Sequence, residues 1–186
     1  MDSKSKSELY ELLQAADVQA FNQYRRDTEF EWLDLNRLDL SGLNLSGINL
    51  SQASLQGTIL DFCLLQEATL VYTQFLKASF REAQLGMVHA PEADFRECDL
   101  YLTNFAGAEL IEARFDSCDA KEARFIEADL SGASFEKSYL NDADFSGAVL
   151  IGARFENAEM DWAILNEVRY DQTTIWGDRK PEAFKQ

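Results

Sequence analysis

A five-residue period runs through most of this chain and limits what it can fold into. Read in fives from Thr28 to Gly177, the sequence forms 30 consecutive pentapeptides with no change of frame. The middle residue of each, here called the centre, is Leu or Phe in 25 of the 30. The residue two before the centre is Ala, Ser, Thr or Cys in 24 of them. Five is a multiple of neither two nor 3.6, so the pattern fits neither a continuous strand nor a helix.

The pattern predicts instead a chain that turns once in every pentapeptide. Residues two apart in an extended segment point to the same side, so the small residue and the centre face inward together. Eight of the nine glycines lie two positions after a centre, and Gly86 is the exception. Glycine readily supplies the positive φ that the third residue of a type II turn requires. The sequence therefore predicts a solenoid whose centres stack along one axis.

Four repeats share a common form: ADLSG (128–132), ADFSG (143–147), ASFRE (78–82) and AELIE (108–112). They resemble the A(D/N)LXX consensus of the pentapeptide repeat family, and the run YDQTTIW resembles the ends of its cyanobacterial members. The resemblance implies an all-β solenoid, a right-handed quadrilateral β-helix with four pentapeptides per coil. At ~4.8 Å per coil, residues 28–177 would form about seven and a half coils and a tower roughly 35 Å long.

Three segments are expected along the chain. They are an N-terminal α-helical cap at 1–27, the repeat β-helix at 28–177, and a C-terminal cap or tail at 178–186. In the tail segment, Phe184 is predicted to fold over the last coil together with Trp176.

The cap is predicted to contain two short helices, at about 7–15 and 18–25. Ser7 is the expected N-cap of the first helix, and Asp17 is the expected N-cap of the second. Both helices carry an apolar stripe that needs a partner. A bare first coil would expose an unpaired backbone edge, so the helices are predicted to lie on it as a lid.

Charge and composition limit the partners. The net charge of −16 argues against direct binding of nucleic acid or of an anionic membrane. The sequence has no run of 18 apolar residues, and its first residues lack the apolar core of a signal peptide. The chain is therefore expected to be a cytoplasmic protein, a monomer or a dimer, with an unidentified protein partner.

No residue pattern indicates an enzyme, a cofactor site or a metal site. Cys63, Cys98 and Cys118 occupy the small inward position and are expected to be reduced core residues. The single histidine, His89, faces outward and has no second histidine or cysteine near it. Phosphate-binding loops, nucleophile elbows and metal-binding signatures are lacking.

Outward residues sort by charge when they are assigned to columns 20 residues apart. The wall around centres 40, 60, 80, 100, 120, 140 and 160, here called the acidic wall, carries nine acids and two bases. The neighbouring wall around centres 35, 55, 75, 95, 115, 135 and 155, here called the mixed wall, carries six of each. The predicted partner-binding residues on the acidic wall are Asp99, Tyr101, Asp119, Glu122, Tyr139, Asp142, Glu159 and Trp162.

Three interpretations of this wall remain open. It is a soluble surface with chance clustering, or it is the binding face of a non-catalytic scaffold or protein–protein interaction module. The resemblance implies such a module for most of the family. The third interpretation is a DNA-mimicking protein that binds or protects DNA gyrase, as some relatives do. The chain lacks the projecting loop and the long apolar C-terminal helix found in those relatives.

Overall fold

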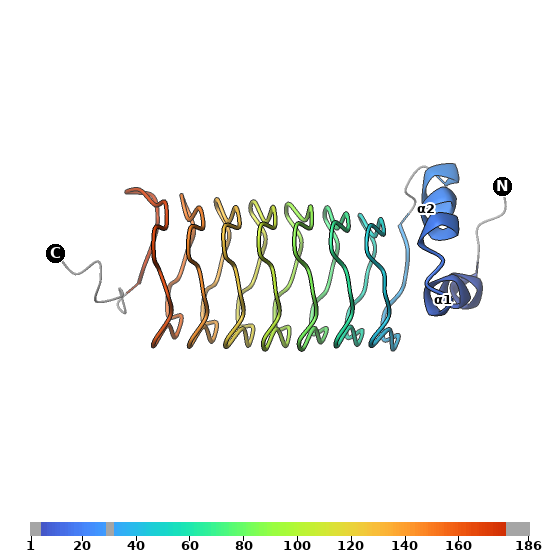
Figure 1. The fold of residues 1–186 in the computed structure, drawn as a ribbon, viewed down its shortest axis with the longest axis horizontal. Coiled ribbons are helices and arrows are strands. Elements are labelled where there is room, and N and C mark those ends of the chain that lie inside the picture. The colour runs from blue at the N-terminus through green and yellow to red at the C-terminus, as the bar shows by residue number, and fades with distance from the viewer. Residues whose placement is uncertain (1–4, 29–31, 178–186) are drawn as a thin grey trace.

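Two short helices precede a four-sided solenoid in the computed structural model, which describes residues 5–28 and 32–177 (Figure 1). Helix α1 spans Lys6–Gln14 and helix α2 spans Val18–Asp27. The described residues contain no extended strand. Instead, one residue per pentapeptide pairs with the residue at the same place in the next coil, always in parallel. The expected boundaries at 28 and 177 remain predictions, and the segment 178–186 with Phe184 lies outside the described residues.

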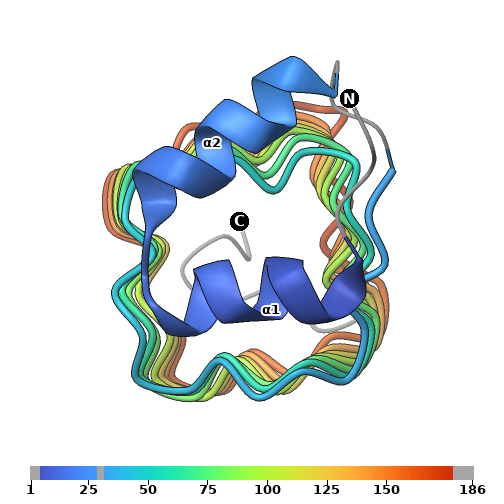
Figure 2. The same cartoon turned by 90° about the vertical axis from the view of Figure 1, so that its right-hand side faces the viewer.

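Each coil takes 20 residues and contributes one bridge to each of four walls. The first four bridges join Asp34 to Ser54, Asp39 to Ile59, Asn44 to Leu64, and Asn49 to Thr69. Viewed from the N-terminal end, the coils form a square through which the chain runs clockwise as it recedes (Figure 2). This is the right-handed sense that the resemblance implies.

A turn closes every corner, and its third residue has a positive φ. The turn is closed by a backbone hydrogen bond, for example from the Ala128 N–H to the Phe125 carbonyl at 3.1 Å. From Arg37 to Glu167, every residue two after a centre has positive φ. Only seven of these 27 positions hold glycine, and eight hold glutamate. The glycine pattern thus located the turns correctly, although most of them have a side chain at the strained position.

The Asp or Asn before a centre caps the backbone of the turn that follows. Asp129 Oδ1, for example, accepts from the Ser131 N–H at 3.0 Å. Where the residue before the centre is serine, the turn N–H is capped instead by an Asp or Asn side chain of the preceding coil. Asp61 Oδ1 accepts from Ser79 Oγ at 2.5 Å and from the Arg81 N–H at 3.0 Å. These bonds explain the Asp or Asn of the repeat, because the turn N–H would otherwise lack a protein partner.

Phenylalanine rings fill the interior in two parallel stacks. Successive rings of the first stack lie 4.7–5.2 Å apart at their centroids. It contains Phe75, Phe95, Phe115, Phe135 and Phe155, as the 20-residue spacing predicted. Phe105, Phe125 and Phe145 form the second stack and meet the first edge to face. Both arrangements are favourable geometries for aromatic pairs.

The repeat frame shifts by one residue in the last coil. Arg154 pairs with Ile175, 21 residues later rather than 20. Ile175 consequently faces outward, whereas Trp176 is buried and stacks on Phe155 at 5.1 Å. The expected unbroken frame, with Ile175 as the last centre, is therefore wrong. The shift lets the larger aromatic side chain continue the phenylalanine stack, which buries more apolar surface.

Helices α1 and α2 lie across the first coil (Figure 2). Leu9, Leu13 and Phe21 are buried in the core that they share with the solenoid. The N-cap of α1 is Ser5 rather than the expected Ser7. Ser5 and Glu8 form a reciprocal capping box, which satisfies two N-terminal N–H groups. The predicted N-cap of α2, Asp17, is confirmed.

Side chains of the helices also donate to backbone carbonyls of the first coil. These bonds run from Lys6 Nζ to Asn36, from Gln14 Nε2 to Asp39, from Asn22 Nδ2 to Gly47 and from Arg25 Nη2 to Ser51. Asn22 also accepts from the Asn49 N–H at 2.8 Å, so one side chain pairs with the coil twice. The helices thereby supply hydrogen-bond partners that a preceding coil would otherwise provide.

Candidate partner-binding wall

The parallel bridges bring the predicted acidic and aromatic residues onto one wall. Bridges join Asp99 to Asp119, Asp119 to Tyr139, and Tyr139 to Glu159. Tyr101, Glu122, Asp142 and Trp162 lie in the turns that follow these bridge positions. All eight residues therefore line one side of the tower over four consecutive coils. Their role in binding a partner remains a prediction.

Both bases of the acidic wall are held by a carboxylate and a tyrosine ring. Arg81 Nη1 lies 2.7 Å from Asp99 Oδ2, and the Arg81 Cζ lies 4.9 Å from the centroid of the Tyr101 ring. The hydrogen bond and charge of Asp99 raise the pKa of Arg81. Lys121 Nζ lies 3.2 Å from Asp119 Oδ2 and 4.9 Å from the centroid of the Tyr139 ring.

Some acids of this wall have a structural role that a charge count does not reveal. Asp99 and Asp119 accept from the backbone N–H groups of Tyr101 and Lys121, so they cap turns as well as pairing with bases. Glu122 differs, because within the described residues its carboxylate accepts a hydrogen bond from the side chain of Tyr101, at 3.0 Å, and none from a backbone N–H. That bond raises the pKa of Tyr101. Among the predicted residues, Glu122, Tyr139, Asp142 and Trp162 are exposed, whereas Asp99, Tyr101, Asp119 and Glu159 are partly buried.

The C-terminal part of the acidic wall is the most open. The side chain of Trp162 is 83% exposed and that of Tyr139 is 45% exposed. Asp142 and Asp161 are also exposed. Within residues 5–28 and 32–177, no base forms an ion pair with Asp142 or Asp161, and no cation lies over the Trp162 ring. Carboxylate and indole groups here face solvent.

The mixed wall neutralises its own charge. Its ion pairs include Arg96–Asp94 at 2.5 Å, Lys77–Glu97 at 3.4 Å and Arg154–Glu156 at 3.2 Å. Burial pushes the pKa of Asp94 upward, but hydrogen bonds from Arg96 and its positive charge outweigh burial and lower it. The two walls therefore differ in organisation as well as in net charge.

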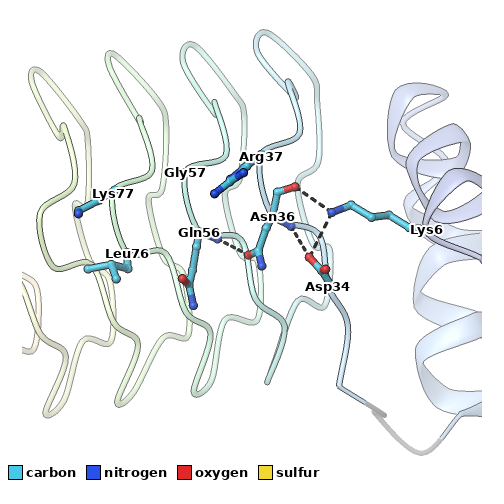
Figure 3. A pocket seen from close by; sticks show the side chains of 8 residues that line it. All are labelled: Lys6, Asp34, Asn36, Arg37, Gln56, Gly57, Leu76 and Lys77. Carbon is cyan, nitrogen blue, oxygen red and sulfur yellow. Dashed lines mark hydrogen bonds and ion pairs between the residues drawn. The ribbon is translucent and has the colours of Figure 1, made fainter.

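A shallow groove lies where the mixed wall meets the cap (Figure 3). It is lined by Lys6, Asp34, Asn36, Arg37, Gln56, Gly57, Leu76 and Lys77. Lys6 reaches across from α1 to Asp34 Oδ1 at 3.1 Å and to the Asn36 carbonyl at 2.9 Å. These contacts fasten the cap to the first coil, so the ion pair between Lys6 and Asp34 has a structural role.

The other chemically active side chains have structural surroundings. The three cysteines are buried and unpaired, and burial raises the pKa of Cys63 to about 11 and that of Cys118 to about 12. His89 Nδ1 lies 2.6 Å from Glu109 Oε2 in the next coil. The described residues contain no cluster of His, Cys, Asp or Glu suited to a metal ion. No helix in the same part of the chain has the length and apolar composition needed to cross a membrane.

Comparisons with known proteins agree with the repeat. A family profile described as "Pentapeptide repeat region" matches residues 88–165, and another, "Pentapeptide repeats (8 copies)", matches residues 34–70. No match was found among curated proteins.

Several solved structures are similar at low identity. HetL, a pentapeptide repeat protein involved in heterocyst differentiation regulation from the cyanobacterium Nostoc sp. strain PCC 7120, is 23% identical. The match covers 75% of this chain and 88% of HetL, with a TM-score of 0.35. Rfr23 from the cyanobacterium Cyanothece 51142 is 19% identical over 85% of this chain and 99% of its own, with a TM-score of 0.42. QnrB1, a plasmid-mediated fluoroquinolone resistance protein, is 22% identical over 76% and 89%, with a TM-score of 0.39.

Proposed function

Because the chain belongs to the pentapeptide repeat family, we propose that it is a non-catalytic interaction module that binds a protein partner through its acidic wall. The observation that supports this proposal is the difference between two neighbouring walls of one tower. On the mixed wall, bases and acids pair with one another. On the acidic wall, nine acids face two bases, and large aromatic side chains stay exposed.

Exposed aromatics and unpaired carboxylates contribute different properties to an interface. Tyrosine and tryptophan are the side chains that most often anchor protein interfaces, while complementary charge sets the encounter rate and the choice of partner. Trp162 is 83% exposed and Tyr139 is 45% exposed, and both lie outside the stacked core of the tower. A partner that covered them would remove apolar surface from water.

A pull-down from extracts of the native host, with the purified protein immobilised, tests the proposal. The test variant carries Glu122→Lys and Asp142→Lys, both in exposed turn positions of the acidic wall. The matched control carries Lys77→Glu and Lys137→Glu, at the same turn position of the mixed wall. We expect the specific partner to be lost with the first variant and kept with the second. A partner lost only with the control would place the interface on the mixed wall.

One observation supports the alternative function, a DNA-mimicking protein that binds or protects DNA gyrase. The bridge ladder places side chains of the acidic wall once per coil along a straight tower, and duplex DNA also presents charge at regular intervals (Figure 1). A supercoiling assay with purified gyrase separates the two candidates. Inhibition or protection of gyrase that is abolished by Glu122→Lys with Asp142→Lys would favour the DNA-mimicking function. No effect at a large excess of the protein would remove it.

A further inference from the structure

The two basic side chains of the acidic wall are held in a similar way. Arg81 and Lys121 each lie within 3.2 Å of a carboxylate oxygen and 4.9 Å from the centroid of a tyrosine ring. Both bases stand one position after a centre, and their acids and rings come from the same coil or the next one. In both sites the cation therefore meets a carboxylate and an aromatic ring together.

The C-terminal coils have the acids and the aromatic ring but no base. At the position of Arg81 and Lys121, later coils have Asn141 and Asp161. Asp161 precedes Trp162 in the chain, and Asp142 occupies the position of Trp162 one coil earlier. By chain order and by register, both acidic residues are therefore neighbours of Trp162, which is 83% exposed. As noted above, no base from the described part of the chain occupies this place.

The tower has no evident need for a tryptophan at this position. Trp162 has φ of 64°, in the left-handed region that a bulky side chain disfavours. Its exposure shows that the ring is not buried against the tower in return. Every repeat residue at this turn position from Arg37 to Glu167 shares that backbone conformation, so Trp162 is distinguished by its exposure, the highest among the exposed large hydrophobic residues of the described chain. A large apolar ring left this open to solvent is typical of a binding surface.

Building on the proposed function of the wall, we propose that Asp142, Asp161 and Trp162 bind an arginine side chain of the protein partner. The guanidinium group is planar, so it can stack on the indole ring while its edge N–H groups donate to the carboxylates. A lysine ammonium is compact and more strongly hydrated, so it stacks less well. The partner should therefore present an arginine-rich segment to the C-terminal coils.

Isothermal titration of the full-length protein with short peptides tests this site. The probes are two acetylated heptapeptides that alternate glycine with three arginines or with three lysines. We expect the arginine peptide to bind more tightly than the lysine peptide. Trp162→Ala should weaken arginine-peptide binding by at least about three-fold, the magnitude of an exposed cation–π contact. Asp142→Asn with Asp161→Asn should weaken it further.

The matched control is Tyr72→Ala, because Tyr72 is an exposed aromatic residue at the same turn position of a different wall. Binding of the arginine peptide should be unchanged in this variant, and the melting temperatures of all variants should match that of the parent. Equal binding by Trp162→Ala and the parent protein would overturn the inference, as would equal binding of both peptides.

The peptide titration and the pull-down fail independently. If Glu122→Lys with Asp142→Lys loses the cellular partner but the arginine peptide does not bind the parent protein, the wall is an interface and the arginine site is wrong. If the peptide binds through Trp162 but the partner is lost only with the mixed-wall variant, the site binds arginine, but the proposed function of the wall is wrong and the arginine does not come from this partner.

Discussion

The third residue of each turn bears a repeated conformational cost. Twenty side-chain-bearing residues of the repeat adopt positive φ, and each costs roughly 1 kcal/mol relative to an ordinary conformation. The solenoid compensates with a backbone hydrogen bond that closes the turn, from the turn at Leu40 to the turn at Met160. It also pairs the N–H of this residue with the next coil, for instance from Glu112 to the Ser131 carbonyl at 2.8 Å. These residues are therefore where single substitutions should raise stability.

Glu112→Gly should stabilise the fold by about 0.5–1 kcal/mol, because glycine adopts positive φ without the steric penalty. The gain is partly offset by the greater entropy of glycine in the unfolded chain. Ala106→Gly is the control, since Ala106 is a turn residue without positive φ. It should cost about 0.5–1 kcal/mol. Urea denaturation of both variants measures the difference, and destabilisation by Glu112→Gly would show that the side chain outweighs the strain.

Asp94 links stability to pH. Its folded-state pKa is lowered, so its contribution is complete above an unfolded-state pKa of about 3.9 and is lost as pH falls through the folded value. Asp94→Asn keeps an oxygen that can accept from the Arg96 N–H but removes the charge. The variant should therefore be less stable than the parent at pH 7. The difference between their free energies of unfolding should be smaller at pH 3. In a protein that already carries Arg96→Gln, Asp94→Asn should cause a smaller loss of stability at pH 7, because Arg96 lowers the pKa of Asp94. Melting curves measure these differences. A difference in melting temperature between the parent and Asp94→Asn that is the same at pH 7 and at pH 3 would contradict the prediction.

At the scale of elements, the two helices stabilise one end of the tower by side-chain hydrogen bonds as well as by apolar burial. Asn22 is the clearest example, because its amide both donates to the Gly47 carbonyl and accepts from the Asn49 N–H. The pair imitates the backbone bridge that another coil would make. A helical cap can thus end a solenoid without leaving an open edge for a second chain.

Asn22→Ala should loosen this end locally. The amide proton of Asn49 should exchange faster with solvent, by about five-fold or more if one net hydrogen bond of ~1 kcal/mol is lost. The amide of Asp129, in the middle of the tower, should exchange at its parent rate. Gln23→Ala is the control, because the exposed side chain of Gln23 forms hydrogen bonds with Arg26 and Asp27 inside α2. Hydrogen exchange followed by NMR reports both amides, and a uniform increase would indicate global destabilisation instead.

At the scale of the whole molecule, the five-residue period was sufficient to predict a solenoid, while the four walls and the first phenylalanine stack also needed the four pentapeptides per coil that the family resemblance implies. Counting in fives failed at Ile175 and Trp176, because the period carries no information about which side chain buries more surface at an open end. It also treated Asp99 and Asp119 only as surface charge. Their backbone bonds depend on the turn geometry, which a charge count does not include. The exposure of Trp162 followed from its outward position, but its surroundings required the register between coils.

The core of the tower should behave as a linear array in which each coil depends on its neighbours. Phe115 is fully buried, 5.0 Å from Phe95 and 4.7 Å from Phe135 at the ring centroids. Phe115→Ala should lower the free energy of unfolding by roughly 3–5 kcal/mol, because the stacked rings on either side cannot collapse into the cavity. Chemical denaturation measures the loss, and hydrogen exchange should show it first in the adjoining coils.

The control for this substitution must avoid the backbone caps. Asp116, one residue later, faces outward and is expected from its position alone to tolerate alanine at a cost below ~0.5 kcal/mol. Its carboxylate, however, accepts from Ser134 Oγ and from the Glu136 N–H, so Asp116→Ala should cost about 1 kcal/mol or more. Lys137→Ala, at an exposed turn position, should stay within ~0.5 kcal/mol of the parent. The expected order of loss is therefore Phe115, then Asp116, then Lys137. A cost for Lys137→Ala equal to that for Phe115→Ala would mean that stability does not reside in the stacked interior.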